Sequence, residues 1–210
     1  MNSGKNINNA LQVIYKTYDN IKKLMEYCKT VADEKTDYYS SVDRFLRRKS
    51  DNDTEAWLLN DFILLFQNEK SEDCESGNGW KNDSVYVLEI CLGEKGNDNI
   101  PLVYLSKFEY YNINEWREGC SPANHWAFYY PLRNEDYMIF KEEGEYRVIT
   151  PKNEKCSNTY WGLKEIVSIS INLFDITSDN VEEKIFGEFD KLSKLTFWTH
   201  YTLTVISYLC

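Results

Sequence analysis

Four charged side chains in the middle of the sequence are of the types that metal-dependent phosphodiester hydrolysis uses: Asp83, Glu89, Lys107 and Glu109. In such enzymes an Asp and a Glu hold a divalent cation, and a Lys positions or activates the attacking water. Glu89 lies between hydrophobic neighbours, where a charge is costly unless it is paired or bound to a cation. However, the usual Glu-x-Lys order is absent, and Lys107-x-Glu109 is its reverse. We therefore favour a surface Glu–Lys pair between strands and keep a metal-dependent nuclease or phosphodiesterase as the alternative.

A second candidate for chemistry is Cys120 with His125, five residues apart in an irregular segment. A thiolate nucleophile needs a nearby base, and loops often display such groups. The sequence has only two histidines, His125 and His200, so a His-rich metal site is excluded, whereas a carboxylate site for magnesium or calcium is not. We favour a buried cysteine and a loop histidine over catalysis, and we predict no cofactor.

Aromatic side chains offer a third interpretation that needs no chemistry. The sequence contains 16 tyrosines and 6 tryptophans, and several aromatic residues gather in and around predicted loops. Aromatic anchors with a charged rim are typical of surfaces that bind a protein or a ligand. The alternative is that most of these rings fill the hydrophobic core. The predicted binding residues are Trp116, Trp126, Phe128, Tyr130 and Trp161.

The net charge of the chain is confined to its second part. Residues 1–70 contain 11 basic and 11 acidic side chains, so residues 71–210 carry the whole net charge of −10. This acidity disfavours nonspecific binding of nucleic acids or membranes. It suits a basic protein partner, although solubility is the simpler explanation.

The sequence predicts a cytoplasmic protein with reduced cysteines and no membrane span. The segment 1–6 lacks the apolar stretch of a signal peptide. The longest apolar run, from Trp57 to Phe66, is interrupted by Asn60 and Asp61 and is too short to cross a bilayer. None of the six cysteines forms the C-x-x-C pair of a zinc site; they are Cys28, Cys74, Cys91, Cys120, Cys156 and Cys210.

Residues 6–32 are predicted to form a long helix. Apolar side chains recur there in alternating steps of four and three residues, which is the spacing of a helix seam. We favour a helix that packs on its own domain. A coiled-coil surface that pairs with a second copy or with a partner is the alternative. The seam consists of Ile7, Leu11, Ile14, Tyr18, Ile21, Met25, Cys28 and Ala32.

Two more helices are predicted before the sheet begins. One covers about 37–49, and the other follows the capping box Asn52-x-x-Glu55. We expect the second helix to be buried, because it has a broad apolar face. The polar segment 71–82 then links the helices to the sheet. The apolar face of the second helix contains Trp57, Leu58, Phe62, Leu65 and Phe66.

From residue 84 the hydrophobic period changes from 3.6 to 2, which indicates strands. The segment Glu165–Phe174 alternates apolar with small polar residues and is predicted as a central strand. A final helix follows the second capping box Asp179-x-x-Glu182, and residues 196–209 form a strand or a helix. The other predicted strands are 85–92, 102–108, 126–130, 137–140 and 146–149, with the first two an antiparallel pair and the last two a hairpin.

These elements predict an α+β fold, in which N-terminal helices pack on a mostly antiparallel sheet of about five to seven strands. One further helix lies near the C-terminus. The helical segment 1–70 and the sheet-rich segment 71–210 are expected to form one compact domain together. The favoured function is a non-enzymatic intracellular binding module, for example of the inhibitor or immunity type, that uses an acidic, aromatic sheet surface.

Overall fold

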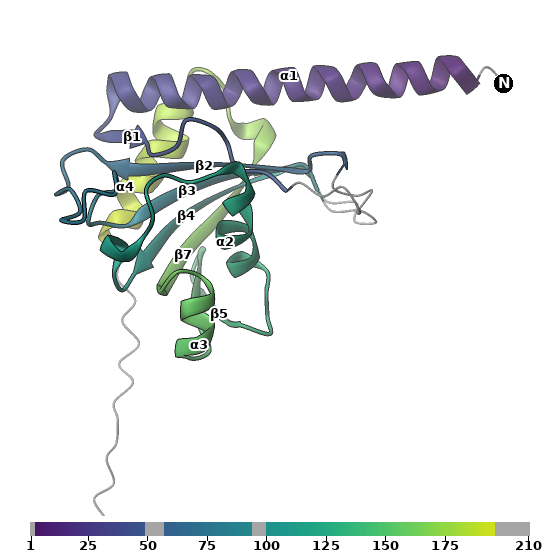
Figure 1. The fold of residues 1–210 in the computed structure, drawn as a ribbon. Helices are drawn as coiled ribbons and strands as arrows, with labels where there is room; N and C mark the ends of the chain where they lie inside the picture. Colours follow the sequence, from purple (N-terminus) through teal and green to yellow (C-terminus); the bar gives the residue numbers. More distant parts are fainter. Residues whose placement is uncertain (1–2, 49–56, 94–99, 196–210) are drawn as a thin grey trace, which may run out of the picture.

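The protein is built around one antiparallel sheet, with the strand order β1-β2-β3-β4-β7-β6-β5 (Figure 1). The computed structural model describes residues 3–48, 57–93 and 100–195, and these contain seven strands. The predicted α+β class, the antiparallel pairing of the strands from residues 85 and 102, and the later hairpin are confirmed. The strands are β1 (Tyr38–Ser40), β2 (Asp61–Asn68), β3 (Val85–Cys91), β4 (Leu102–Tyr110), β5 (Met138–Glu143), β6 (Tyr146–Pro151) and β7 (Leu163–Asn172).

The predicted central strand is β7, which pairs with β4 over almost its full length. Successive side chains of β7 point to opposite faces of the sheet, and each face carries its own hydrophobic core. Val167 packs in the core on one face, whereas Ile166 packs in the core on the other face. Ser168 is buried, with its hydroxyl oxygen 2.7 Å from that of Ser106 on the paired strand, so the small polar positions pair across the strands.

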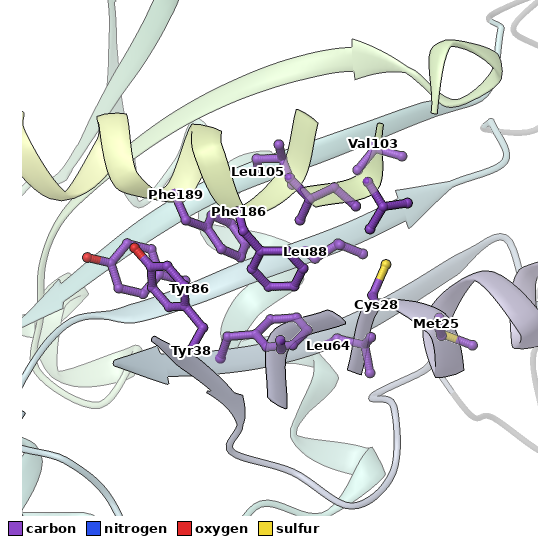
Figure 2. Close-up of a cluster of buried hydrophobic side chains, with 14 of the residues drawn as sticks. Met25, Cys28, Tyr38, Leu64, Tyr86, Leu88, Val103, Leu105, Phe186 and Phe189 are labelled. Atoms are coloured by element: carbon purple, nitrogen blue, oxygen red, sulfur yellow. The ribbon is translucent and has the colours of Figure 1, made fainter. Parts of the chain in front are cut away.

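One face of the sheet is covered by helices from both ends of the chain. The predicted N-terminal helix is α1 (Ser3–Lys35), and it buries Ile21, Met25 and Cys28 against the sheet. The predicted C-terminal helix begins as a π-helical turn, Glu182–Phe186, and continues as α4 (Gly187–Lys194). Figure 2 shows rings from α4 and its preceding turn meeting rings of β1 and β3. Its predicted apolar face is confirmed, since Val181, Ile185, Phe189 and Leu192 are all fully buried.

The opposite face is covered by short helical pieces. The helix α2 (Trp126–Tyr129) lies between the 3₁₀ turns Pro122–His125 and Tyr130–Leu132, and α3 (Glu154–Thr159) precedes β7. Phe128 of α2 is fully buried against the sheet. This second core contains Leu65, Trp80, Val87, Phe108, Phe128, Ile149 and Ile166.

The prediction of two helices between residues 37 and 66 was wrong. The first segment forms β1 and then an extended stretch in which Leu46 pairs with Ile63. The second forms β2, while the predicted capping box at Asn52 lies outside the described residues. Neighbouring residues of β2 enter opposite cores, so the strand is apolar on both faces. Such a strand lacks the alternation that distinguishes a strand from a buried helix.

The strand predicted at 126–130 was also wrong, because this segment is α2 and the start of a 3₁₀ turn. Pro122 opens the preceding turn, and the side chain of Asn124 accepts a hydrogen bond from the backbone N–H of Ser121 at 2.8 Å. The fixed backbone φ of a proline at the first helical position already has the value that a helix needs. The segment between the predicted hairpin and the predicted central strand contains α3, and the segment 196–209 lies outside the described residues.

Candidate functional site

The four residues predicted for metal chemistry do not meet at one point. Glu89 lies on the same face of β3 as Val87, toward α2, whereas Lys107 lies on the same face of β4 as Leu105, toward α4. Asp83 is exposed in a turn, where it accepts a hydrogen bond from the hydroxyl of Ser71 at 2.5 Å. Metal-dependent hydrolysis needs these groups around one cation, so the set does not form a single site.

Lys107 and Glu109 form a charge pair on the face that α4 covers. Their charged atoms are 2.9 Å apart, and Lys164 on β7 approaches the other carboxylate oxygen at 3.2 Å. Lys107 also donates to the carbonyl oxygen of Leu195. Burial opposes ionisation of Glu109, but the hydrogen bonds from Lys107 and Lys164 outweigh it and lower the pKa of the carboxyl. The Glu–Lys contact between strands joins Glu109 to Lys164, a residue that the sequence did not single out, and both side chains are largely buried rather than at the surface.

Glu89 is fully buried and is paired with Arg133, a residue that the sequence did not single out. The guanidinium group donates to both carboxylate oxygens, at 2.6 and 3.1 Å. It also lies over the ring of Tyr129, 3.9 Å from the ring centre. Burial raises the pKa of Glu89, although Arg133 acts against this shift. A two-point Arg–carboxylate pair of this kind fixes geometry as well as charge.

His125 is engaged with Asp61 rather than with Cys120. Its Nε2 is hydrogen-bonded to the carboxylate of Asp61 on β2, and its ring stacks on Tyr129 with centres 4.8 Å apart. Burial raises the pKa of the Cys120 thiol to about 12, so it is protonated at neutral pH. The sequence favoured a buried cysteine and a loop histidine, whereas Cys120 is only partly buried and His125 is buried in a 3₁₀ turn.

Together these side chains attach the α2 region to the sheet. Asp61 and Glu89 come from the adjacent strands β2 and β3 and lie on the same face. His125 and Arg133 flank α2 on its two sides. Each acid interrupts an apolar strand in the sequence, which is the signal that a partner is needed. The sequence spacing does not identify which basic residue pairs with each of these two acids.

The predicted aromatic binding residues divide into two groups. Trp116 and Trp161 line an open groove with a cavity volume of about 890 Å³, which we call the aromatic groove. Phe128 is fully buried beneath both indoles, and Trp126 packs on Trp161 with ring centres 5.9 Å apart. Tyr130 is 41% exposed but does not line the groove. The groove is also lined by Asn112, Glu115, Arg117, Glu118, Asn124 and Asn158.

The two indoles of the aromatic groove are held in a fixed arrangement. Their ring centres are 5.0 Å apart in an edge-to-face geometry, and Trp116 Nε1 donates to the carbonyl oxygen of Trp161 at 3.1 Å. Trp161 has a backbone φ of 60°, in the left-handed region, and Gly162 follows with a φ of 78°. A non-glycine residue held there costs about 1–3 kcal/mol, and such strain is concentrated at functional sites. The groove is therefore the best candidate site.

Within the described residues, no three His, Cys, Asp or Glu side chains gather to hold a metal ion. None of the helices in that part of the chain is long and apolar enough to cross a membrane. Comparisons with protein-family models, with curated proteins and with solved structures give no match to this chain.

Proposed function

We propose that this chain is a non-enzymatic binding module, of the inhibitor or immunity type, that holds a basic, extended polypeptide segment in the aromatic groove. The observation that carries the proposal is the preset pair of Trp116 and Trp161 on the wall of an open groove. Large aromatic side chains in fixed positions supply binding area at a low entropy cost, and tryptophan is enriched among the residues that dominate binding energy.

A polypeptide suits the polar part of the groove wall. Asn124 and Asn158 stand beside the indoles, and an amide side chain both donates and accepts hydrogen bonds, as a peptide backbone does. The wall thus combines apolar area for a side chain with amides for main-chain groups. Orientation by a few polar groups within an aromatic lining is typical of binding sites.

The charge of the surface favours a basic occupant. Glu115 and Glu118 lie exposed on the groove with one base, Arg117, between them. The chain as a whole has a net charge of −10. Complementary charge speeds the encounter with a basic partner and suppresses acidic ones.

A reducing, cytoplasmic location is part of the proposal. The five cysteines among the described residues, Cys28, Cys74, Cys91, Cys120 and Cys156, are all free thiols. Free buried thiols fit a reducing compartment, in which disulfides are rare.

The test is selection of linear peptides from a random displayed library on the full chain, followed by fluorescence anisotropy. We expect selected peptides to combine Lys or Arg with an apolar side chain. Glu118→Lys should weaken their binding about fivefold or more, because it places like charge on the groove. Trp161→Ala should weaken it about tenfold or more. The matched control is Glu135→Lys, an exposed acid outside the groove, which should leave affinity within about twofold.

Glu118 makes no internal hydrogen bond or ion pair among the described residues, so its variant tests binding without a cost to folding. Far-UV and near-UV circular dichroism of Trp161→Ala separates a lost contact from a lost fold. Failure to select any peptide, or equal affinity of the wild type and Glu118→Lys, would overturn the proposal.

A further inference from the structure

The first half of α1 extends past the sheet as an arm, residues 3–17 (Figure 1). None of its side chains is buried, and the buried part of α1 begins at Ile21. The last contact before the arm is made by Tyr18, whose ring lies 5.7 Å from that of Phe62. Its hydroxyl is hydrogen-bonded to the backbone of Leu59. No residue of the arm therefore belongs to either hydrophobic core, although Ile14 is half-buried.

The apolar seam of α1 nevertheless continues along the arm. Ile7, Leu11 and Ile14 keep the spacing of the buried residues that follow, and Ile7 and Leu11 are 63% and 43% exposed. Such a stripe is normally covered in the functional state of a protein. The face of α1 that docks on the sheet therefore continues along the arm, where the described residues leave Ile7 and Leu11 exposed and Ile14 half-buried.

The arm is also a poor helix on its own. It contains Asn6, Asn8 and Asn9 in its first turns, and no acidic residue there complements the helix dipole. An isolated helix of this length is marginal in water even for alanine-rich sequences. The arm extends a helix that is already formed, and packing against another surface would stabilise it further.

The spacing of the seam points to a second copy of the same chain. The steps from Ile7 to Leu11, Ile14 and Tyr18 are four, three and four residues, which read the same in both directions. An antiparallel partner on a two-fold axis between Leu11 and Ile14 would therefore place each apolar residue opposite another. Such a self-complementary contact is what a two-fold dimer requires.

The positions beside the seam support the same pairing. Asn8, Ala10, Tyr15 and Thr17 flank it, and none of them is charged. Flanking positions are where like charges would oppose self-association. The only charged residues of the arm, Lys5 and Lys16, lie away from the seam.

The body of the protein offers a further apolar surface at the end of the seam. Trp57 and Leu58 are 67% and 50% exposed and directly precede Leu59, whose backbone holds the hydroxyl of Tyr18. In the antiparallel arrangement, Ile7 of the second copy lies opposite Tyr18, beside these two residues. The exposed apolar side chains of the seam and of this corner would be covered by one association.

We infer that the chain forms a two-fold dimer in which the arms of two copies pair antiparallel across Leu11 and Ile14. This inference does not depend on the aromatic groove, and either can fail without the other.

The test is the mass of the full chain in solution, by sedimentation over a range of concentrations. We expect a dimer that dissociates on dilution. Leu11→Glu or Ile14→Glu should weaken the dimer about a hundredfold or more, since each substitution enters the interface twice. Val13→Glu is the matched control, because Val13 is 65% exposed on the same turn but lies off the seam. Far-UV circular dichroism should show that the two seam variants lose helix as they become monomeric.

Crosslinking tests the orientation. A mixture of Leu11→Cys and Ile14→Cys chains should form the mixed disulfide between them, whereas Leu11→Cys alone should not crosslink. A chain that is monomeric at every concentration would overturn the inference. So would a dimer that Leu11→Glu leaves intact, one that Val13→Glu weakens equally, or crosslinking of Leu11→Cys to itself.

Discussion

At the residue scale, the buried charges show what a sequence does and does not specify. Glu89 stands among apolar strand neighbours, so its need for a partner is predictable. Its partner Arg133 is 44 residues away, and the contact depends on how α2 lies on the sheet. Lys107 and Glu109, by contrast, are two positions apart on one strand and share a face by geometry alone. The local pair was predictable and the distant one was not.

Glu109 should make the stability of the protein depend on pH. Its folded pKa is lowered from the ordinary value of 4.5. The ionised carboxylate therefore stabilises the fold above the unfolded pKa, and this contribution is lost as the pH falls through the folded pKa. Near neutral pH, Glu109→Gln should lower the free energy of unfolding by about 1–3 kcal/mol, because Lys107 loses a charged acceptor. The difference from wild type should shrink toward zero in acid.

Urea denaturation across this pH range measures the effect. Glu142→Gln is the control, because its pair with Arg147 is exposed and should contribute less than about 1 kcal/mol at any pH. A difference between wild type and Glu109→Gln that grows on acidification would contradict the argument.

At the element scale, periodicity and β-branched composition identified most of the long elements, including β3, which is buried on both faces. The helix α1 and the strands β3, β4 and β7 were confirmed within a few residues. The strand β2 was predicted as a helix, because Ile63 and Leu64 enter opposite cores and leave no alternation to detect. The helix α2 was predicted as a strand from its aromatic residues, although Pro122 opens a helical turn just before it. The first error came from an apolar run that fits a helix or a strand, and the second from a local turn signal that outweighed the strand preference of aromatic residues.

The pair of Glu89 and Arg133 should hold α2 against the sheet. Arg133→Met leaves an unpaired buried carboxylate, so we expect a loss of about 3–5 kcal/mol in the free energy of unfolding. Adding Glu89→Leu should restore much of the loss, since replacing both partners of a buried pair with apolar groups is often neutral. Arg147→Met, which breaks only an exposed pair, is the control. Urea denaturation gives all four values, and a double variant no more stable than Arg133→Met would count against a paired role.

At the scale of the whole molecule, the aromatic groove results from the pairing of distant strands. Trp116 and Trp161 are 45 residues apart in the sequence. They meet because β4 ends beside the start of β7, where the N–H of Tyr111 donates to the carbonyl oxygen of Gly162 at 2.9 Å. Composition and position led to the prediction that both indoles bind a partner, and that role stays a prediction. The two indoles meet only because of the order of the strands in the sheet, and no local sequence pattern encodes that order.

Because β1 and β2 lie in the same sheet as β3 to β7, we expect the neutral and acidic parts of the chain to fold together. Residues 1–70 supply β1 and β2, which pair with β3 from the acidic part, and α1, which covers one core. A fragment of residues 71–210 would expose the edge of β3 and lose much of that core. We expect this fragment to lack near-UV circular dichroism and a cooperative urea transition, whereas the full chain unfolds in one transition by both circular dichroism and tryptophan fluorescence.

The matched truncation is residues 18–210, which removes the arm but leaves every buried residue of α1 in place. It should keep the near-UV spectrum and the cooperative transition of the full chain, because the residues removed contribute nothing to either core. Cooperative unfolding of the 71–210 fragment would instead mean that β3 to β7 form an independent unit. The contribution of α1, β1 and β2 to the core would then be dispensable for folding, contrary to the burial of Cys28, Leu64 and Phe66.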